Sequence, residues 1–289
     1  MTAILREALW SAALLRRFSP FRRFAASTLQ RFNVSTPQRE RASAFTLLEL
    51  LIVVSIIGLL LVLIAPAFTT IKGGTDVTSA AYTIKGALDT ARTYAKANNT
   101  YTWVGFYEED ASGASTNPAT PGIGRLVMSI VASKDGTRGY DVTNPSNPAW
   151  TNYSSGANFV AVTKPQYLDN IHLATTLNGP SYQPPSSGNM ARPWIQFDNY
   201  VIGNAPFSVT PFDWPLGSAL NAGQYSFHKV INFDPQGVAR IQYLTNSDGI
   251  ATYMEVGLQQ THGNSVSSSP NVVAIQLGGV GGGISVYRP

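Results

Sequence analysis

Residues 50–71 form an uncharged, strongly apolar run, and the residue directly before it, Glu49, carries a carboxylate. A helix of about 20 apolar residues is long enough to cross the hydrocarbon core of a membrane. A charged side chain beside hydrocarbon is costly, about 2.5 kcal/mol or more at the bilayer centre, so a sequence that keeps one usually needs it. The sequence therefore predicts a membrane-spanning helix over about 50–71 and a specific use for Glu49.

The basic residues lie on the N-terminal side of this run. Residues 1–44 hold eight arginines against Glu7 and Glu40, a net charge of +6, whereas the other 245 residues hold 12 Lys/Arg and 14 Asp/Glu, a net charge of −2. The positive-inside bias predicts that residues 1–44 stay in the cytoplasm and that the rest is exported. A signal peptide fits poorly, because the apolar region of a signal peptide is shorter than the run of residues 50–71. A plain signal anchor would give Glu49 no role.

Composition narrows the class of the exported part. Charged residues make up 12% of the chain and aromatic residues 11%, which favours a β-rich extracytoplasmic body. The absence of cysteine excludes disulfides, thiolate metal sites and cysteine nucleophiles. Without residues 1–44 the chain is mildly acidic, so nucleic acid is an unlikely partner.

The stretch AFTLLELLIVVSIIGLLLVLIAP, residues 44–66, resembles the N-terminal signal of type IV prepilins and type II secretion pseudopilins. The resemblance implies that a prepilin peptidase/methyltransferase cleaves between Ala44 and Phe45 and methylates the new amine of Phe45. It also implies that Pro66 stands where the helix bends. A cationic amine freed in the membrane can pair with Glu49 of a neighbouring subunit, which offsets the desolvation of both charges. The alternative for Glu49 is interfacial snorkelling.

Two features depart from the family pattern. Ala44 stands where the family usually has glycine, and a leader of 44 residues is long for the family. No methionine occurs between Met1 and Met128, so another start site would need a non-ATG codon. A solvated tail is favoured for residues 1–44 over a basic interfacial helix.

An amphipathic helix is predicted beyond the apolar run. Apolar residues recur at helical spacing from Val77 to Ala95, with charged residues between them. Gly73-Gly74 is expected to interrupt or soften the helix and Asn98-Asn99 to end it, so residues 45–98 could form one bent helix of up to ~80 Å. The stretch ALDTARTYAKANNT, residues 87–100, resembles the same helix in GspH/FimT-like minor pseudopilins and pilins.

The remainder, residues 99–289, is predicted to be a β-rich periplasmic or extracellular domain, which gives an α+β fold with the helix packed on antiparallel sheet. The candidate strands are 101–107, 125–132, 158–163, 194–202, 226–233, 237–244, 251–258, 271–277 and 283–288. Residues 231–241, with an Asp-Pro-Gln-Gly turn, and 272–288 are predicted hairpins that resemble the C-terminal hairpins of the GspH/FimT domain. The Pro-, Asn- and Gly-rich region of about 108–225 is predicted to form long surface loops.

No catalytic set is found, so the protein is not expected to be an enzyme. His172, His228 and His262 are widely separated, and the glycines of 278–283 fit a hairpin loop better than a phosphate-binding loop. His228 is expected to be a half-buried strand residue. Calcium is an alternative at Glu108-Glu109-Asp110 and Asp248-Gly249, but solvated turns are favoured there because no EF-hand-like ligand series surrounds them. The aromatic residues of the loops are expected to anchor those loops rather than to stack on a ligand; they are Trp150, Tyr153, Trp194 and Trp214.

Together these features predict a structural subunit of a type IV pilus-like or type II secretion filament. The GspH/FimT resemblance favours a minor subunit, and a closer resemblance is to cassette-type prepilin-like proteins of Verrucomicrobia. Its expected partners are the prepilin peptidase and other pilin or pseudopilin subunits. Its expected location is the inner membrane and then the filament. The alternative is an exported binding module, lectin-like or DNA-binding, that uses a pilin stalk for delivery.

Overall fold

The computed structural model describes residues 45–138, 158–175, 192–193, 195, 200–204, 208, 211–218, 222–241, 250–267 and 271–288. The predicted leader, 1–44, lies outside these residues, as do the side chains of residues 63–74. The chain divides into two compact units, Met1–Val54 and Ser55–Pro289.

Helix α1 runs from Leu47 to Ala97, which agrees with the predicted helix over 45–98. It is continuous over Gly73-Gly74, so an interruption there, one of the two predicted effects, does not occur; glycine lowers helix propensity without ending the helix. The helix ends as predicted: Asn99 has a φ of 48°, and the N–H of Thr100 donates to the carbonyl of Ala95 at 3.0 Å. A left-handed residue followed by this bond satisfies carbonyls of the last turn.

The side chains of residues 45–62 are all exposed. The predicted span of 50–71 continues past residue 62 into the part of α1 whose side chains are not described. Pro66 lies in that part of α1, so its side chain is not described either. Over the residues that the structure describes, no helix combines the length and apolar character needed to cross a membrane.

The second part of α1 buries one face, as its periodicity predicts. The buried positions are Val77, Ala80, Ala81, Ile84, Ala87, Leu88, Ala91 and Ala95. The opposite face, which includes Tyr82, Gly86 and Thr90, is exposed. Because the buried positions recur every three or four residues, they form one stripe that packs on the sheet.

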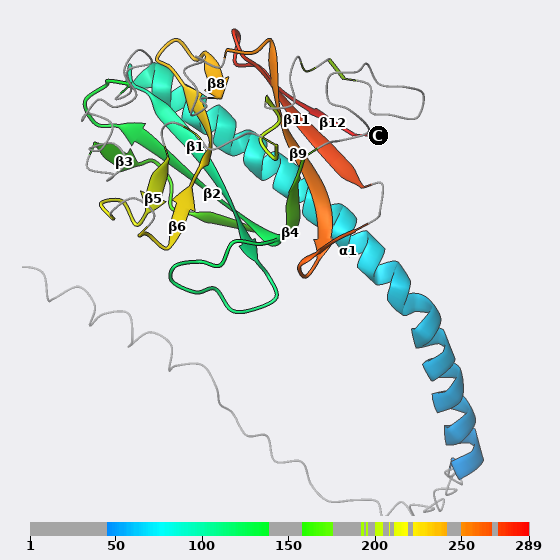
Figure 1. Cartoon of the computed structure of the whole chain (residues 1–289). Helices are drawn as coiled ribbons and strands as arrows, with labels where there is room; N and C mark the ends of the chain where they lie inside the picture. The colour runs from blue at the N-terminus through cyan, green and yellow to red at the C-terminus, as the bar shows by residue number, and fades with distance from the viewer. Residues whose placement is uncertain are drawn as a thin grey trace, which may run out of the picture. The chain divides into compact units, whose positions relative to one another are not determined.

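The helix packs on a β-sheet (Figure 1). Among the residues that the structure describes, this sheet has ten strands, and every pair of neighbouring strands is antiparallel. The strand order is β12-β11-β9-β4-β2-β1-β7-β8, with β10 paired to β9 and β3 paired to β2. The strands are β1 Thr102–Asp110, β2 Gly124–Ser133, β3 Phe159–Ala161, β4 Gln166–Ala174, β7 Lys229–Phe233, β8 Ala239–Ile241, β9 Tyr253–His262, β10 Ser265–Val266, β11 Val272–Gly278 and β12 Ile284–Tyr287. The prediction of an α+β fold is confirmed.

The two ends of the sheet path approach one another beside α1. The N–H of Ala239, in β8, donates to the carbonyl of Gly279 in the β11–β12 turn at 2.9 Å. Arg92 of α1 donates from Nη2 to the carbonyl of Gly281 at 2.6 Å. Gly282 has a φ of 61°, and a Cβ there would lie 2.3 Å from the carbonyl oxygen of Gly237. Only glycine fits this position. Together, these contacts join β8, the β11–β12 turn and α1.

A small hairpin covers the face of the sheet that points away from α1. It is formed by β5, Phe212–Trp214, and β6, Tyr225–Phe227. Its aromatic side chains pack on those of the main sheet: the ring of Phe212, in β5, meets that of Phe159, in β3, edge to face at 5.9 Å. Within the hairpin, the rings of Phe212 and Phe227 stack 4.8 Å apart. The two faces of β1 therefore border two different apolar clusters.

Gly105 allows this close approach. A Cβ at Gly105 would lie 2.6 Å from the Cβ of Phe227 and 2.7 Å from a ring carbon of Phe212. Gly105→Ala is therefore expected to lower the free energy of unfolding by about 1–3 kcal/mol through overpacking. The measurement is urea denaturation of the full chain. Gly86→Ala, on the open face of α1, is the control and should raise stability by about 0.5–1 kcal/mol, because a Cβ there meets nothing within 4 Å. A neutral Gly105→Ala would contradict the packing argument.

Most of the predicted strands are confirmed, including both hairpins. In the first, Ile231 pairs with Ile241, and Asp234 accepts the turn N–H groups of Gln236 and Val238 at 3.0 and 2.9 Å. The second is β11–β12. The predicted strand 226–233 is divided at His228 into β6 and β7, so His228 is not a strand residue. Part of the predicted strand 194–202 lies outside the described residues; within it, Val201 makes an isolated bridge to Glu255.

The prediction of loops over about 108–225 missed three segments: β4, β5 and the last residues of β1. Strand β4 lies in the middle of the sheet, between β2 and β9. It carries polar residues on its first half and an irregular register near Asn170, whose φ is 62°. Strand β10 was also missed, since two residues are too short for a pattern.

Candidate functional site

The start of α1 is closed by a reciprocal pair of side chains. Glu49 accepts at Oε2 from the backbone N–H of Thr46 at 2.9 Å and from its Oγ1 at 3.0 Å. In return, the backbone N–H of Glu49 donates to Thr46 Oγ1 at 3.2 Å. This is a capping box, and it satisfies N–H groups that have no partner within the helix. The Thr-x-x-Glu spacing of Thr46 and Glu49 is the sequence signal of a capping box. The predictions made for Glu49 consider this residue alone and do not include the cap.

These hydrogen bonds lower the pKa of Glu49, since both the N–H and the hydroxyl of Thr46 favour the ionised form. Both bonds from Thr46 end on Oε2, so among the residues that the structure describes Oε1 is left as an acceptor for a cation. Phe45 is 76% exposed, and Ala44 lies outside the described residues. The first residues of α1 therefore present an ionised, oriented carboxylate four positions after Phe45.

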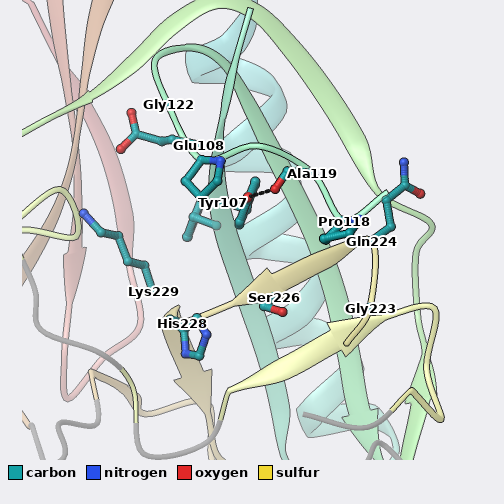
Figure 2. A pocket seen from close by; sticks show the side chains of 12 residues that line it. Tyr107, Glu108, Pro118, Ala119, Gly122, Gly223, Gln224, Ser226, His228 and Lys229 are labelled. Carbon is teal, nitrogen blue, oxygen red and sulfur yellow. Dashed lines mark hydrogen bonds between the residues drawn. The ribbon is translucent and has the colours of Figure 1, made fainter. Parts of the chain in front are cut away.

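A pocket of about 610 Å³ lies on the globular part of the chain, beside the end of β1 (Figure 2). Twelve residues line it: Phe106, Tyr107, Glu108, Pro118, Ala119, Pro121, Gly122, Gly223, Gln224, Ser226, His228 and Lys229. The segment of Pro118 to Gly122 forms one wall. It is held by Tyr107 OH, which donates to the carbonyl of Ala119 at 2.7 Å, and by the N–H of Ala119, which donates to the carbonyl of Gln224 at 2.8 Å.

The charged side chains gather at one side of this pocket, where Figure 2 shows Glu108 and Lys229. Glu108 Oε1 lies 2.6 Å from His172 Nδ1 and accepts the N–H of Leu173 at 2.9 Å. Lys229 donates to the carbonyl of Gly203. Burial lowers the pKa of Lys229, and the charge of Glu108 opposes that shift. The histidine that the sequence leaves isolated, His172, thus orients a pocket carboxylate.

His228 also lines the pocket and lies near a buried acid. Its pKa is lowered from 6.5 by burial, an effect that the negative charge of Asp213 partly opposes. Asp213 is 2% exposed, and neither of its carboxylate oxygens has a hydrogen-bond partner in the described part of the chain. Asp213 lies opposite Ser226 in the β5–β6 pair. Sequence alone gives no signal for this arrangement, because 15 positions separate Asp213 from His228.

The lowered pKa of His228 predicts a pH dependence of stability. Below 6.5 the unfolded chain binds a proton on this imidazole before the folded chain does, so the free energy of unfolding falls as the pH is lowered through this window. The contribution cannot exceed about 1.4 kcal/mol per pH unit, the value for one proton. Urea titrations from pH 7 to 5 should show a shallower slope for His228→Gln than for the parent chain. Equal slopes would contradict the assignment.

Glu108-Glu109-Asp110, predicted as a solvated turn, instead forms the end of β1. Glu109 is 1% exposed; it accepts from Arg125 Nη1 at 3.2 Å and from Ser115 Oγ. Burial and the charge of Glu109 raise the pKa of Tyr107. Among the residues that the structure describes, no group of three or more acidic or histidine side chains could hold a metal ion. Asp248-Gly249 lies outside those residues.

The remaining predicted residues are not brought together. His262 ends β9, and its Nε2 lies 3.3 Å from Gln260 Nε2. The glycines of 278–283 lie at the β11–β12 turn, as predicted. Trp214 lies in β5 and packs beside the aromatic cluster of Trp103, which agrees with an anchoring role. Trp150, Tyr153 and Trp194 lie outside the described residues.

The start of the chain matches a known family model. Residues 39–65 match the model described as the prokaryotic N-terminal methylation motif. The matched range includes Ala44, Phe45 and the capping box of Thr46 and Glu49, and it supports a type IV pilin-like prepilin. No match was found among curated proteins or among solved structures.

Proposed function

We propose that this protein is a filament subunit of the type IV pilin or type II secretion pseudopilin type, with a minor rather than a major position. The match of residues 39–65 to the N-terminal methylation motif carries this proposal. In this proposal the chain is an assembling structural protein rather than an enzyme. Its GspH/FimT-like character rests on the resemblance of the second half of α1 and of the C-terminal hairpins.

The proposed maturation places the cut between Ala44 and Phe45 and a methyl group on the new amine of Phe45. The prepilin peptidase removes the basic residues 1–44 from the cytoplasmic side. Until then the chain is held as a single span in the inner membrane, with residues 99–289 exported. Removal of the leader leaves a cationic amine four residues before a carboxylate that Thr46 already orients.

In assembly, the amine of Phe45 on one subunit pairs with Glu49 of its neighbour. An ion pair in a low-dielectric environment is stabilised strongly only when both charges are present and correctly placed. The exposed apolar side chains of residues 50–62 provide the surface through which α1 packs on other pilin subunits or on lipid. The pair then fixes the axial register, because a shift along the helix would separate the charges.

The first experiment determines the N-terminus and intact mass of the protein from cells with and without the prepilin peptidase. We expect a peptidase-dependent start at Phe45 that carries a methyl group, in the membrane fraction. Ala44→Asp should prevent this cleavage, because the position before the cut requires a small residue, and Ala42→Asp is the matched control. Retention of residues 1–44 in both strains would overturn the proposed function.

A further inference from the structure

The pocket beside β1 has hydrogen-bonding capacity that the described part of the chain does not use. Among the residues that the structure describes, both contacts to the Glu108 carboxylate involve Oε1, which leaves Oε2 as an acceptor. The ammonium group of Lys229 has three N–H donors, and the bond to Gly203 occupies one of them. Gln224 and Ser226 add an amide and a hydroxyl to the lining. A ligand in this pocket therefore meets both donors and acceptors.

The charges of the pocket cancel. Glu108 and Lys229 have opposite formal charges, and the charge of Glu108 is felt at Lys229. His228 is held neutral at pH 7, because burial lowers its pKa from 6.5. A site without net charge gives neither an anion nor a cation a Coulombic advantage. The ligand that fits best is uncharged and carries groups that both donate and accept.

The rest of the pocket is apolar and held in place. Pro118 and Pro121 present exposed rings, and Gly122 and Gly223 also line the pocket. The bonds of Ala119 to Tyr107 and Gln224 fix the proline wall before any ligand arrives. A volume of about 610 Å³ lies within the ~300–1,000 Å³ range of small-molecule sites.

We propose that this pocket binds a neutral mono- or disaccharide, with ring hydroxyls between Glu108 and Lys229 and an apolar ring face on the proline wall. A hydroxyl group both donates and accepts, so a pair of neighbouring hydroxyls satisfies the carboxylate and the ammonium together. A sugar ring also has C–H faces that pack on Pro118 and Pro121. This binding activity does not depend on filament assembly, since all of its residues lie after residue 105.

The test uses the full chain in a sugar-free detergent, because maltoside or glucoside detergents would compete. An array of neutral glycans, acidic glycans and capped neutral peptides gives the first readout. Calorimetric titration of the strongest neutral hit then gives the Kd. We expect binding of neutral glycans and at least a tenfold weaker Kd for Glu108→Gln and for Lys229→Met, because each removes a hydrogen bond to a charged group.

Lys164→Met is the matched control: Lys164 is exposed and does not line the pocket. It should bind as the parent chain does. Ser226→Ala, which removes only a hydroxyl from the lining, gives a second pocket variant if either charge variant fails to fold, and should weaken binding severalfold. Circular dichroism establishes that each variant tested is folded. Binding confined to acidic glycans or to peptides, no binding, or neutral-glycan binding that no pocket variant weakens would each overturn the proposal.

Discussion

Glu49→Ala is expected to remove the protein from the sheared filament fraction, by more than about tenfold, while cleavage between Ala44 and Phe45 continues. The substitution leaves the methylated amine of a neighbouring subunit without a counter-charge in a low-dielectric environment. It also removes an acceptor from the first turn of α1, where Thr46 donates twice to this carboxylate. The measurement is the ratio of filament-bound to membrane-bound subunit, with the N-terminus determined in both fractions.

Two further variants separate the charge of Glu49 from its capping role. Glu49→Gln keeps an oxygen that can accept from Thr46 but removes the charge, so it should fail to assemble as Glu49→Ala does. Thr46→Val removes the hydroxyl of the capping box but keeps the charge and the backbone donor, so it should assemble at a reduced level. Normal filaments from Glu49→Gln would show that the residue only caps the helix, and the proposed ion pair would then be wrong.

Glu255→Ala should destabilise the globular part more than any surface substitution, by about 3–5 kcal/mol. Glu255 is 1% exposed and accepts a two-point contact from Arg192, with Nε–Oε2 and Nη2–Oε1 distances of 2.6 and 3.1 Å. Gln276 Nε2 donates to the same carboxylate at 3.0 Å. Removing the acid takes the two-point carboxylate partner from the guanidinium of Arg192, whose side chain is 9% exposed. Domains are stable by only about 5–15 kcal/mol, so urea denaturation should detect a large decrease in midpoint.

Two comparisons make this expectation specific to the buried pair. Arg192→Leu combined with Glu255→Leu should be more stable than Glu255→Ala, since neither charge is then left alone. Asp89→Ala breaks the half-exposed Lys85–Asp89 pair of α1, with an N–O distance of 2.8 Å, and should cost less than about 0.5 kcal/mol. If Glu255→Ala changes stability no more than Asp89→Ala does, the buried pair is not a major source of stability.

Local patterns account for what the sequence predicted well. The stripe from Val77 to Ala95 has helical periodicity, and the residues that end α1, Asn98 and Asn99, are ones that tolerate a helix C-terminus. The hairpin of 231–241 is specified by alternating apolar residues and by Asp234, which accepts from its own turn. In each case the residues that determine the structure lie within a few positions of one another.

Long-range contacts account for what the sequence could not supply. The first half of β4 is exposed and polar, and its central place depends on pairing with β2 and β9. The acids from Glu108 to Asp110 predict a solvated turn because no ligand series surrounds them in the sequence, yet the partner of Glu108, His172, is 64 positions away. The Arg192–Glu255 pair is separated by 63 positions. No pattern in one stretch of sequence identifies such partners.

The contact between Arg92 and Gly281 has a consequence for synthesis of the chain, because 189 positions separate the two residues. The ribosome therefore completes α1 long before it makes the β11–β12 turn that closes beside it. Until then the alanine-rich face of the nascent helix lacks part of its cover, and folding has to wait for contacts of high sequence separation. Premature termination before the β11–β12 hairpin would therefore release a chain with an open apolar face, which chaperones and proteases recognise.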